Sequence, residues 1–173
     1  LNDAERSVSE IGRVELPYAP ALYNKYIQDI PRGAEPGNCL HEIFENIDFE
    51  IVNGILESED PGVFLITHPK VGDVIRESCI RYGISKRYYR AIGDLIYNTL
   101  KTKMVDAYNT EERVILSEID TVDLKAEMEF QFSYAKTNRV ELFPQGEDAN
   151  FVKGFIDLLF RKNGRYYILD WKS

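Results

Sequence analysis

Two aspartates and a lysine near the end of the sequence are spaced so that they could act together. Asn163-Gly164 stands between two apolar runs, which is a strong indication of a β-hairpin. If these two residues form the turn, residues whose numbers sum to 327 lie opposite each other, and Asp157 faces Asp170. Directly opposed Cβ atoms are about 5 Å apart, and Lys172, two residues beyond Asp170, projects from the same face. The spacing predicts two neighbouring carboxylates with an ammonium group beside them.

The hairpin strands are apolar on both faces, which predicts that they are central and buried. The negative charges of two opposed carboxylates would then have to be neutralised. One carboxyl could stay protonated, Lys172 could pair with both, or a divalent cation could lie between them. Mg²⁺ commonly uses one or two protein carboxylates, with water and substrate phosphate as its other ligands. The alternative without an ion turns one aspartate to solvent and leaves the other in an ordinary ion pair. The residues alone leave these arrangements open.

The rest of the chain must position this hairpin, and it reads as a single domain of mixed α/β (α+β) class with three parts. Residues 1–36 form an irregular lead-in, 37–110 a helical part and 111–173 a sheet part. Apolar residues recur at helical spacing in four segments: Ala21–Ile30, Cys39–Asn46 with Asn38 as N-cap, Val71–Tyr82, and Lys86–Val105 after a break at Gly83.

The sheet part predicts a three-stranded antiparallel meander. Residues Lys125–Tyr134 alternate polar and apolar side chains, and a Pro/Gly/acidic loop follows at Phe143–Ala149. Phe151–Phe160 and Tyr166–Trp171 are the two arms of the hairpin.

The composition of the chain argues against a membrane protein and a disulfide-rich protein. The chain has 173 residues and a net charge of −8, with no apolar run long enough to span a bilayer, so we expect no membrane association and a cytoplasmic location. Two cysteines are too few for a disulfide framework or an iron–sulfur cluster. The chain begins with Leu1 rather than Met, from which we expect it to be part of a longer protein.

One basic stretch departs from this acidic balance. Residues 76–103 contain seven cations and two anions, with tyrosines interleaved. This pattern is typical of a solvated helix face, and the alternative is a nucleic-acid groove. Under that alternative the candidate DNA contacts are Arg87, Arg90 and Lys101.

Four sequence segments resemble the C-terminal nuclease domain of the RecB family (exonuclease V beta subunit) in the PD-(D/E)xK superfamily. They occur in the same order as in that family and cover the chain from about residue 31 to its end. Gly37–Phe49 is similar to the Leu-His helix that opens that domain, and Glu127-Met-Glu-Phe130 to its glutamate-bearing strand. Gly154–Asp157 and Asn163–Ser173 resemble the nuclease motif itself. The resemblance implies a restriction-endonuclease-like core.

The resemblance also implies a role for each matched residue. One Mg²⁺, or Mn²⁺, would be held by His41, Asp157, Asp170 and the backbone carbonyl of Trp171. Lys172 would orient or activate the attacking water, and Glu127 would lie near the metal, with Glu129 as the competing assignment. Without the resemblance, His41 would be read as a hydrogen-bonded helix histidine, and His68 is expected to be a loop residue.

The implied activity is Mg²⁺-dependent hydrolysis of DNA phosphodiester bonds, as in an exodeoxyribonuclease V that processes double-strand breaks for recombination. Its implied partners are DNA, a helicase part of the same polypeptide and RecC- and RecD-type subunits. In that family a helix follows the Asp-x-Lys strand, and the sequence up to Ser173 does not include it. The sequence also contains no Walker loop. We therefore expect an incomplete core that is inactive or weakly active in isolation. The alternative is a non-catalytic scaffold that keeps the nuclease fold.

Overall fold

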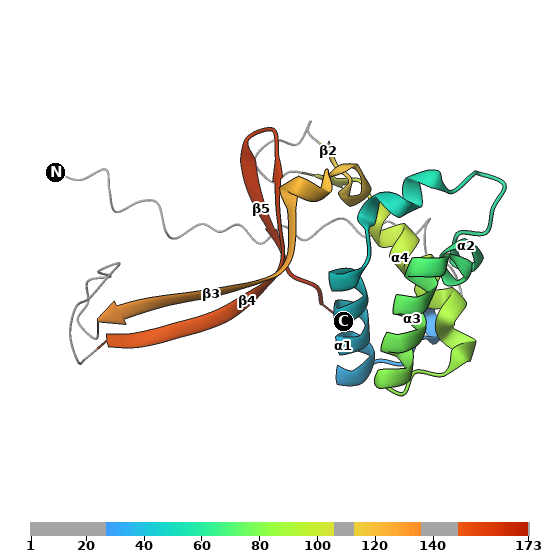
Figure 1. The fold of residues 1–173 in the computed structure, drawn as a ribbon, viewed down its shortest axis with the longest axis horizontal. Helices are drawn as coiled ribbons and strands as arrows, with labels where there is room; N and C mark the ends of the chain where they lie inside the picture. The colour runs from blue at the N-terminus through green and yellow to red at the C-terminus, as the bar shows by residue number, and fades with distance from the viewer. Residues whose placement is uncertain (1–26, 106–112, 136–148, 173) are drawn as a thin grey trace.

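The computed structural model describes residues 27–105, 113–135 and 149–172, and within them the fold is mixed α/β, as predicted (Figure 1). The helices gather on one side of the molecule, and the sheet begins beside them and extends away. The helices are α1 (Ala34–Asn46), α2 (Pro61–Thr67), α3 (Pro69–Arg81) and α4 (Tyr89–Lys101). The strands are β1 (Met104–Val105), β2 (Arg113–Val114), β3 (Leu124–Ala135), β4 (Ala149–Lys162) and β5 (Arg165–Leu169). Short 3-10 turns lie at Ile27–Asp29, Phe49–Gly54, Lys86–Tyr88, Leu116–Glu118 and Thr121–Asp123.

The predicted meander is confirmed. Strands β3, β4 and β5 pair antiparallel in that order, and β1 pairs separately with β2. The β4–β5 ladder runs from Leu158 opposite Leu169 to Lys162 opposite Arg165, which is the predicted register. Asn163 and Gly164 both have positive φ, 50° and 75°. A two-residue turn with left-handed conformation at both positions matches the right-handed twist of the strands that it joins.

Two helix boundaries differ from the predictions by four residues or more. Helix α1 begins at Ala34 rather than Cys39, so Asn38 lies inside it and is not its N-cap. Pro36 is tolerated because first-turn N–H groups need no intrahelical acceptor. The predicted helix Lys86–Val105 ends at Lys101, since Thr102 is extended and Met104 already belongs to β1.

Helix α2 was not predicted, although its start carries a recognisable signal. Asp60 is the N-cap and accepts a hydrogen bond from the Val63 N–H, and Pro61 follows in the first turn. His68, expected in a loop, caps α3, because its Nδ1 accepts from the Val71 N–H. Most of the predicted helix Ala21–Ile30 and of the loop Phe143–Ala149 lies outside the described residues. In the described part of the chain no helix has the length and apolar character required to cross a bilayer.

The core lies between the helices and the near end of the sheet. It contains Ile43 of α1, Ile75 of α3, Ile96 of α4 and Leu158 of β4, each with no exposed surface. The prediction that the hairpin strands are buried on both faces is wrong, since the side chain of Ile168 in β5 is 68% exposed. In the described part of the chain, Leu158 and Phe160 of β4 belong to the core beneath the helices, and away from the helices β3 and β4 extend as a two-stranded ribbon (Figure 1).

Two glycines let α2 and α4 approach closely. A Cβ atom on Gly62 would lie 2.6 Å from the Arg90 carbonyl oxygen, and one on Gly93 would lie 2.7 Å from the Gly62 carbonyl oxygen. The Gly62 N–H also donates to Asp94 Oδ1 at 3.0 Å, and Asp94 is itself buried. The contact fixes α4 against α2, next to the core that supports α1.

We expect Gly93→Ala to lower the free energy of unfolding by about 1–3 kcal/mol, because the methyl group meets backbone that cannot move aside. This overpacking should outweigh the gain in helix propensity, which is at most about 1 kcal/mol. Urea unfolding measures the effect. Gly54→Ala is the control, since nothing lies within 4 Å of its would-be Cβ, and an equal change in the two variants would contradict the packing argument.

Candidate active site

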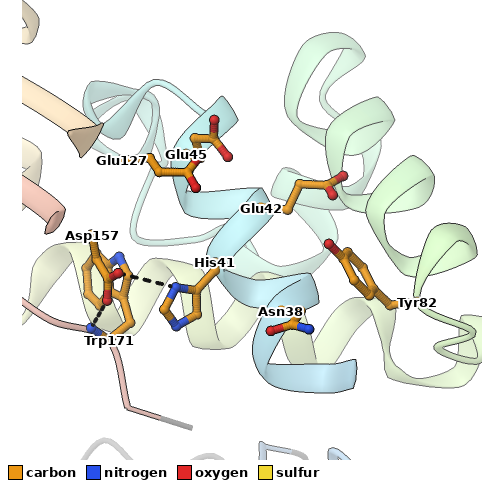
Figure 2. A pocket seen from close by; sticks show the side chains of 8 residues that line it. All are labelled: Asn38, His41, Glu42, Glu45, Tyr82, Glu127, Asp157 and Trp171. Carbon is orange, nitrogen blue, oxygen red and sulfur yellow. Dashed lines mark hydrogen bonds and ion pairs between the residues drawn. The ribbon is translucent and has the colours of Figure 1, made fainter. Parts of the chain in front are cut away.

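His41 and Asp157 come together where α1 meets β4. His41 Nδ1 lies 3.7 Å from Asp157 Oδ1, and the Asp157 side chain is 19% exposed. Figure 2 shows the imidazole and the carboxylate pointing toward each other. Two ligands of one ion, each bound at about 2.1 Å, are at most about 4.2 Å apart. The separation is therefore one that a single divalent cation could bridge.

Asp170 is not the ladder partner that the register predicted for Asp157. Strand β5 ends at Leu169, and the Trp171 N–H donates to Asp157 Oδ2 at 2.7 Å. The Trp171 ring stacks on Phe44 of α1, with centroids 4.6 Å apart, which directs the end of the chain toward α1. The structure thus brings the amide of Trp171 to Asp157, whereas the resemblance implied its carbonyl as a metal ligand.

Asp170 and Lys172 nevertheless lie beside the same site. The Lys172 ammonium pairs with the Asp170 carboxylate and lowers the pKa of Asp170. Asp157 and His41 act on that pKa in the same direction, and partial burial opposes them. The Asp170 side chain is 58% exposed, so the prediction of two carboxylates enclosed in an apolar interior is wrong. Asp157 lines a pocket, and Asp170 lies beside Asp157 and is paired with Lys172.

Glu127 lies opposite Asp157 at a break in the β3–β4 ladder. The pairs on both sides of this position follow one register, but Glu127 and Asp157 do not pair. Glu127 has φ 45°, a left-handed conformation that costs a non-glycine residue about 1–2 kcal/mol. Such strain persists where the surroundings enforce it and is concentrated at functional sites. In Figure 1 both strands bend at the level where β5 ends.

The competing assignment, Glu129, lies elsewhere. Its carboxylate pairs with Lys153 at 3.0 Å, out on the extending ribbon. Glu127 lines the pocket with Asp157, and Glu129 does not.

His41, Glu127 and Asp157 line a cavity of about 260 Å³, which we call the acidic pocket (Figure 2). Its lining residues come from α1, the end of α3, β3, β4 and the segment after β5: Asn38, His41, Glu42, Glu45, Tyr82, Glu127, Asp157 and Trp171. The sequence analysis placed none of Glu42, Glu45, Tyr82 and Asn38 in a functional site. The spacing of Glu45, four residues after His41, was a usable signal, because positions i and i+4 share a helix face.

Glu42 links α1 to α3 beside the pocket through hydrogen bonds and an ion pair. Burial opposes its charged form, but hydrogen bonds from Ser78, Arg81 and Tyr82 hold the Glu42 pKa below its ordinary value. The Ser78 Oγ and Arg81 Nη1 distances to Glu42 Oε1 are 2.9 and 2.6 Å. Burial, and then the hydrogen bond to Glu42, raise the pKa of Tyr82, so its hydroxyl remains a donor. Glu42 is therefore engaged in holding the helix that carries His41.

Glu45 is the neighbour of Glu127 (Figure 2). Burial and then the hydrogen bond and charge of Glu127 raise the pKa of Glu45. A carboxyl whose pKa is raised by folding is protonated more readily in the folded than in the unfolded state. Its contribution to stability is therefore lost as the pH rises from the ordinary glutamate value through the raised one.

We accordingly expect Glu45→Gln to raise the melting temperature at about pH 7, by an amount equivalent to less than about 1 kcal/mol. The difference should vanish below about pH 4, where Glu45 is already neutral. Thermal unfolding at several pH values measures it. Glu57→Gln, at an exposed position outside the pocket, is the control, and a Glu45→Gln effect that does not change with pH would contradict the explanation.

The three candidate DNA contacts of the basic stretch lie outside the acidic pocket and have local partners. Arg90 pairs with Asp60, Arg87 lies 4.5 Å from the centroid of the Tyr88 ring, and Lys101 Nζ donates to Asn53 Oδ1 at 2.7 Å. These contacts favour the solvated-helix interpretation. A role of Arg87, Arg90 and Lys101 in DNA binding stays a prediction.

The donors at the pocket suit Mg²⁺ or Mn²⁺ in type, since they comprise two carboxylates and an imidazole. His41 and Asp157 are already close enough to share an ion, whereas Asp170 is engaged by Lys172. Among the described residues, no three histidine, cysteine or acidic side chains converge as a ready-made metal site. Binding would therefore have to draw Asp170 away from Lys172.

Comparison with known proteins supports the resemblance seen in the motifs. No protein-family model matches the chain. It is 28% identical over 160 residues to the RecBCD enzyme subunit RecB of Escherichia coli, which covers 83% of this chain and 12% of that protein. Identity to the RecB subunits of Haemophilus influenzae and Borreliella burgdorferi is 26% and 28%, over 85% and 92% of this chain. The chain spans only 12–13% of the length of these relatives. The resemblance to RecB is thus confirmed across most of this sequence.

Proposed function

We propose that this chain is a metal-dependent nuclease module that hydrolyses DNA phosphodiester bonds. The observation that carries the proposal is the meeting of His41 and Asp157 at 3.7 Å, with the paired Asp170 and Lys172 beside them. Sequence similarity to RecB, a subunit of the RecBCD enzyme, supports the same class of activity.

The charge of the acidic pocket explains why a cation would be required. Glu42, Glu45, Glu127 and Asp157 line the pocket, and no lysine or arginine side chain is among the described lining residues. A phosphodiester would be repelled from such a surface unless positive charge were supplied. His41, Asp157 and Asp170 would hold Mg²⁺, which when bound stabilises the developing phosphoryl charge and lowers the pKa of a coordinated water.

Residues of the chain itself would orient the metal ligands, bind the attacking water and accept its proton. The Trp171 N–H fixes the orientation of the Asp157 carboxylate through Oδ2, which leaves Oδ1 facing His41. With Asp170 as a ligand of the cation, Lys172 Nζ would be available to donate a hydrogen bond to the attacking water or to a phosphoryl oxygen. Glu127 is held by strained backbone at the same level of the sheet, where its carboxylate can accept a proton from water.

The biological setting that we propose is an exodeoxyribonuclease V-type helicase–nuclease that processes double-strand breaks for recombination. A net charge of −8 suits a module to which other parts of the assembly deliver DNA. The proposed partners are a helicase region of the same polypeptide and RecC- and RecD-type subunits.

End-labelled linear DNA incubated with the protein tests the activity directly. We expect at least weak cleavage with Mg²⁺ or Mn²⁺ and none when EDTA removes the cation. Cleavage that continues unchanged in EDTA would contradict the metal-dependent mechanism.

The second candidate function is a non-catalytic scaffold. It is favoured by the Lys172–Asp170 ion pair, which occupies one of the three donors. The scaffold hypothesis predicts association with partner subunits, no cation binding at the pocket and no cleavage under any condition.

A further inference from the structure

Asn38 lines the acidic pocket, and the proposed mechanism gives it no role. It lies in the second turn of α1, three residues before His41. Residues three apart on a helix are neighbours on one face, with Cβ atoms about 5–6 Å apart. In Figure 2 the His41 ring lies between Asp157 and the Asn38 carboxamide. Asn38 is therefore one position removed from the two side chains that would hold the cation.

Asn38 differs from the charged side chains of the pocket in its hydrogen bonding. Those charged side chains are all hydrogen-bonded or ion-paired already: His41, Glu42, Glu45, Glu127 and Asp157. The Asn38 carboxamide makes no hydrogen bond to any residue that the structure describes, and no dashed line reaches it in Figure 2. Its two N–H donors are thus available to a ligand that enters the pocket.

The charges around Asn38 indicate which ligand group would use these donors. Ionised carboxylates accept hydrogen bonds and donate none, and among the described lining residues there is no lysine or arginine. A DNA strand bound through the cation brings a second phosphate near these carboxylates, which repel it. A neutral N–H donor can bind that phosphate and adds no charge to the cation site.

The position of Asn38 suits this second phosphate. The separation of neighbouring residues on one helix face is close to the separation of successive phosphates along one DNA strand. With one phosphate bound by the cation beside His41, the next phosphate of the strand would lie at the level of Asn38.

We propose that Asn38 donates a hydrogen bond to the phosphate next to the one that the cation binds, and so positions the strand in the acidic pocket. This inference rests on the proposed nuclease function and deepens it by naming a substrate-binding residue. The neighbouring phosphate does not react, so the contact has the same strength before and during the reaction. Loss of such a contact raises KM and leaves kcat unchanged.

Two short substrates test this role. A thymidine dinucleotide contains only the phosphate that is cleaved, whereas a thymidine trinucleotide also offers a neighbouring phosphate. We expect Asn38→Ala to raise the KM for the trinucleotide about 10-fold, as for the loss of one hydrogen bond to a charged group. The KM for the dinucleotide should change less than about twofold. Asn38→Asp keeps the size of the side chain but adds a negative charge, and should raise the trinucleotide KM more than Asn38→Ala does.

Asn46→Ala is the matched control, because Asn46 lies on the same helix outside the pocket, where its Nδ2 donates to the Glu42 carbonyl oxygen. It should leave both KM values unchanged. Asn38→Ala should fold normally, since the position is exposed and alanine favours a helix more than asparagine does.

NMR of the Asn38 side-chain amide gives a second readout that requires no cleavage. In the presence of Mg²⁺, the trinucleotide should shift the Nδ2–H signals of Asn38, and the dinucleotide should shift them much less. If cleavage is too slow to yield a KM, this difference decides the question.

The proposal is overturned if Asn38→Ala leaves the trinucleotide KM unchanged, if it raises both KM values equally, or if the trinucleotide leaves the Asn38 amide signals in place. An effect confined to adenine-containing oligonucleotides would assign Asn38 to base recognition and also overturn it. In all these cases the wild-type protein would still bind Mn²⁺ and cleave DNA. Failure of the nuclease proposal would look different, because the wild-type protein would then bind no Mn²⁺ and cleave neither substrate, and the inference would fall with it.

Discussion

Replacement of Lys172 by methionine should lower the rate of DNA cleavage by about 10²–10³-fold, the usual effect of losing one donor to developing charge. The same variant should bind Mn²⁺ as tightly as the wild type or more tightly. The reason is that Lys172 pairs with Asp170 in the cation-free site and so competes with the ion for that carboxylate. Cleavage of labelled DNA and calorimetric titration of Mn²⁺ measure the two effects separately.

Lys70→Met removes an exposed lysine near the start of α3 and should alter neither quantity. A Lys172→Met variant that loses both activity and Mn²⁺ affinity would contradict the assigned role, since it would show that Lys172 maintains the site rather than acting in the reaction. Lys172→Arg keeps the charge but changes its geometry, and we expect only partial recovery of the rate.

Asp157→Asn should lower cleavage by about 10³-fold or more, because metal-ion stabilisation of the transition state amounts to several kcal/mol. The substitution preserves size, and the amide oxygen can still accept the Trp171 N–H that Asp157 Oδ2 accepts now. The variant should therefore fold normally and fail only in the reaction. Circular dichroism and a cleavage time course with Mg²⁺ establish both points.

Asp73→Asn on α3 is the matched control, because this carboxylate pairs with Arg76 on the surface and does not line the acidic pocket. Retention of more than about a tenth of the wild-type rate in Asp157→Asn would be incompatible with a cation held chiefly by this side chain.

The sequence was sufficient to predict the hairpin, because its signal is local. Asn163 and Gly164 accept positive φ, and a two-residue turn then fixes the register of every pair in the ladder. The point at which β5 ends depends instead on a tertiary contact. Trp171 stacks on Phe44 of α1 and turns the chain out of the sheet, so the predicted opposition of Asp157 and Asp170 became a looser arrangement.

The exposure of much of the sheet could not be predicted from the sequence, for a related reason. Apolar residues on both faces of β4 indicated a central strand, and β4 is central in the order of strands. Whether a face is covered depends on where the helices lie, and in the described residues they cover only the end near Leu158 and Phe160. The same apolar pattern therefore includes buried residues at one end of β4 and exposed residues, Phe151 and Phe155, at the other.

The candidate site was predictable where residues are close enough along the chain for their spacing to determine the geometry. Glu45 shares a helix face with His41, and Lys172 lies two residues after Asp170. The left-handed backbone of Glu127 was not predictable, because glutamate has no preference for it and the strain is imposed by packing. Glu42 and Tyr82 entered the pocket only because α1 packs on α3.

Titration of Mn²⁺ into the wild-type protein, His41→Ala and Asp157→Asn tests the central claim most directly, since it requires no activity. The account predicts saturable binding of one ion per wild-type chain and loss of that binding in both variants, with Asp73→Asn unchanged. An unaltered affinity in His41→Ala and Asp157→Asn, or a wild-type protein that binds no Mn²⁺, would contradict it.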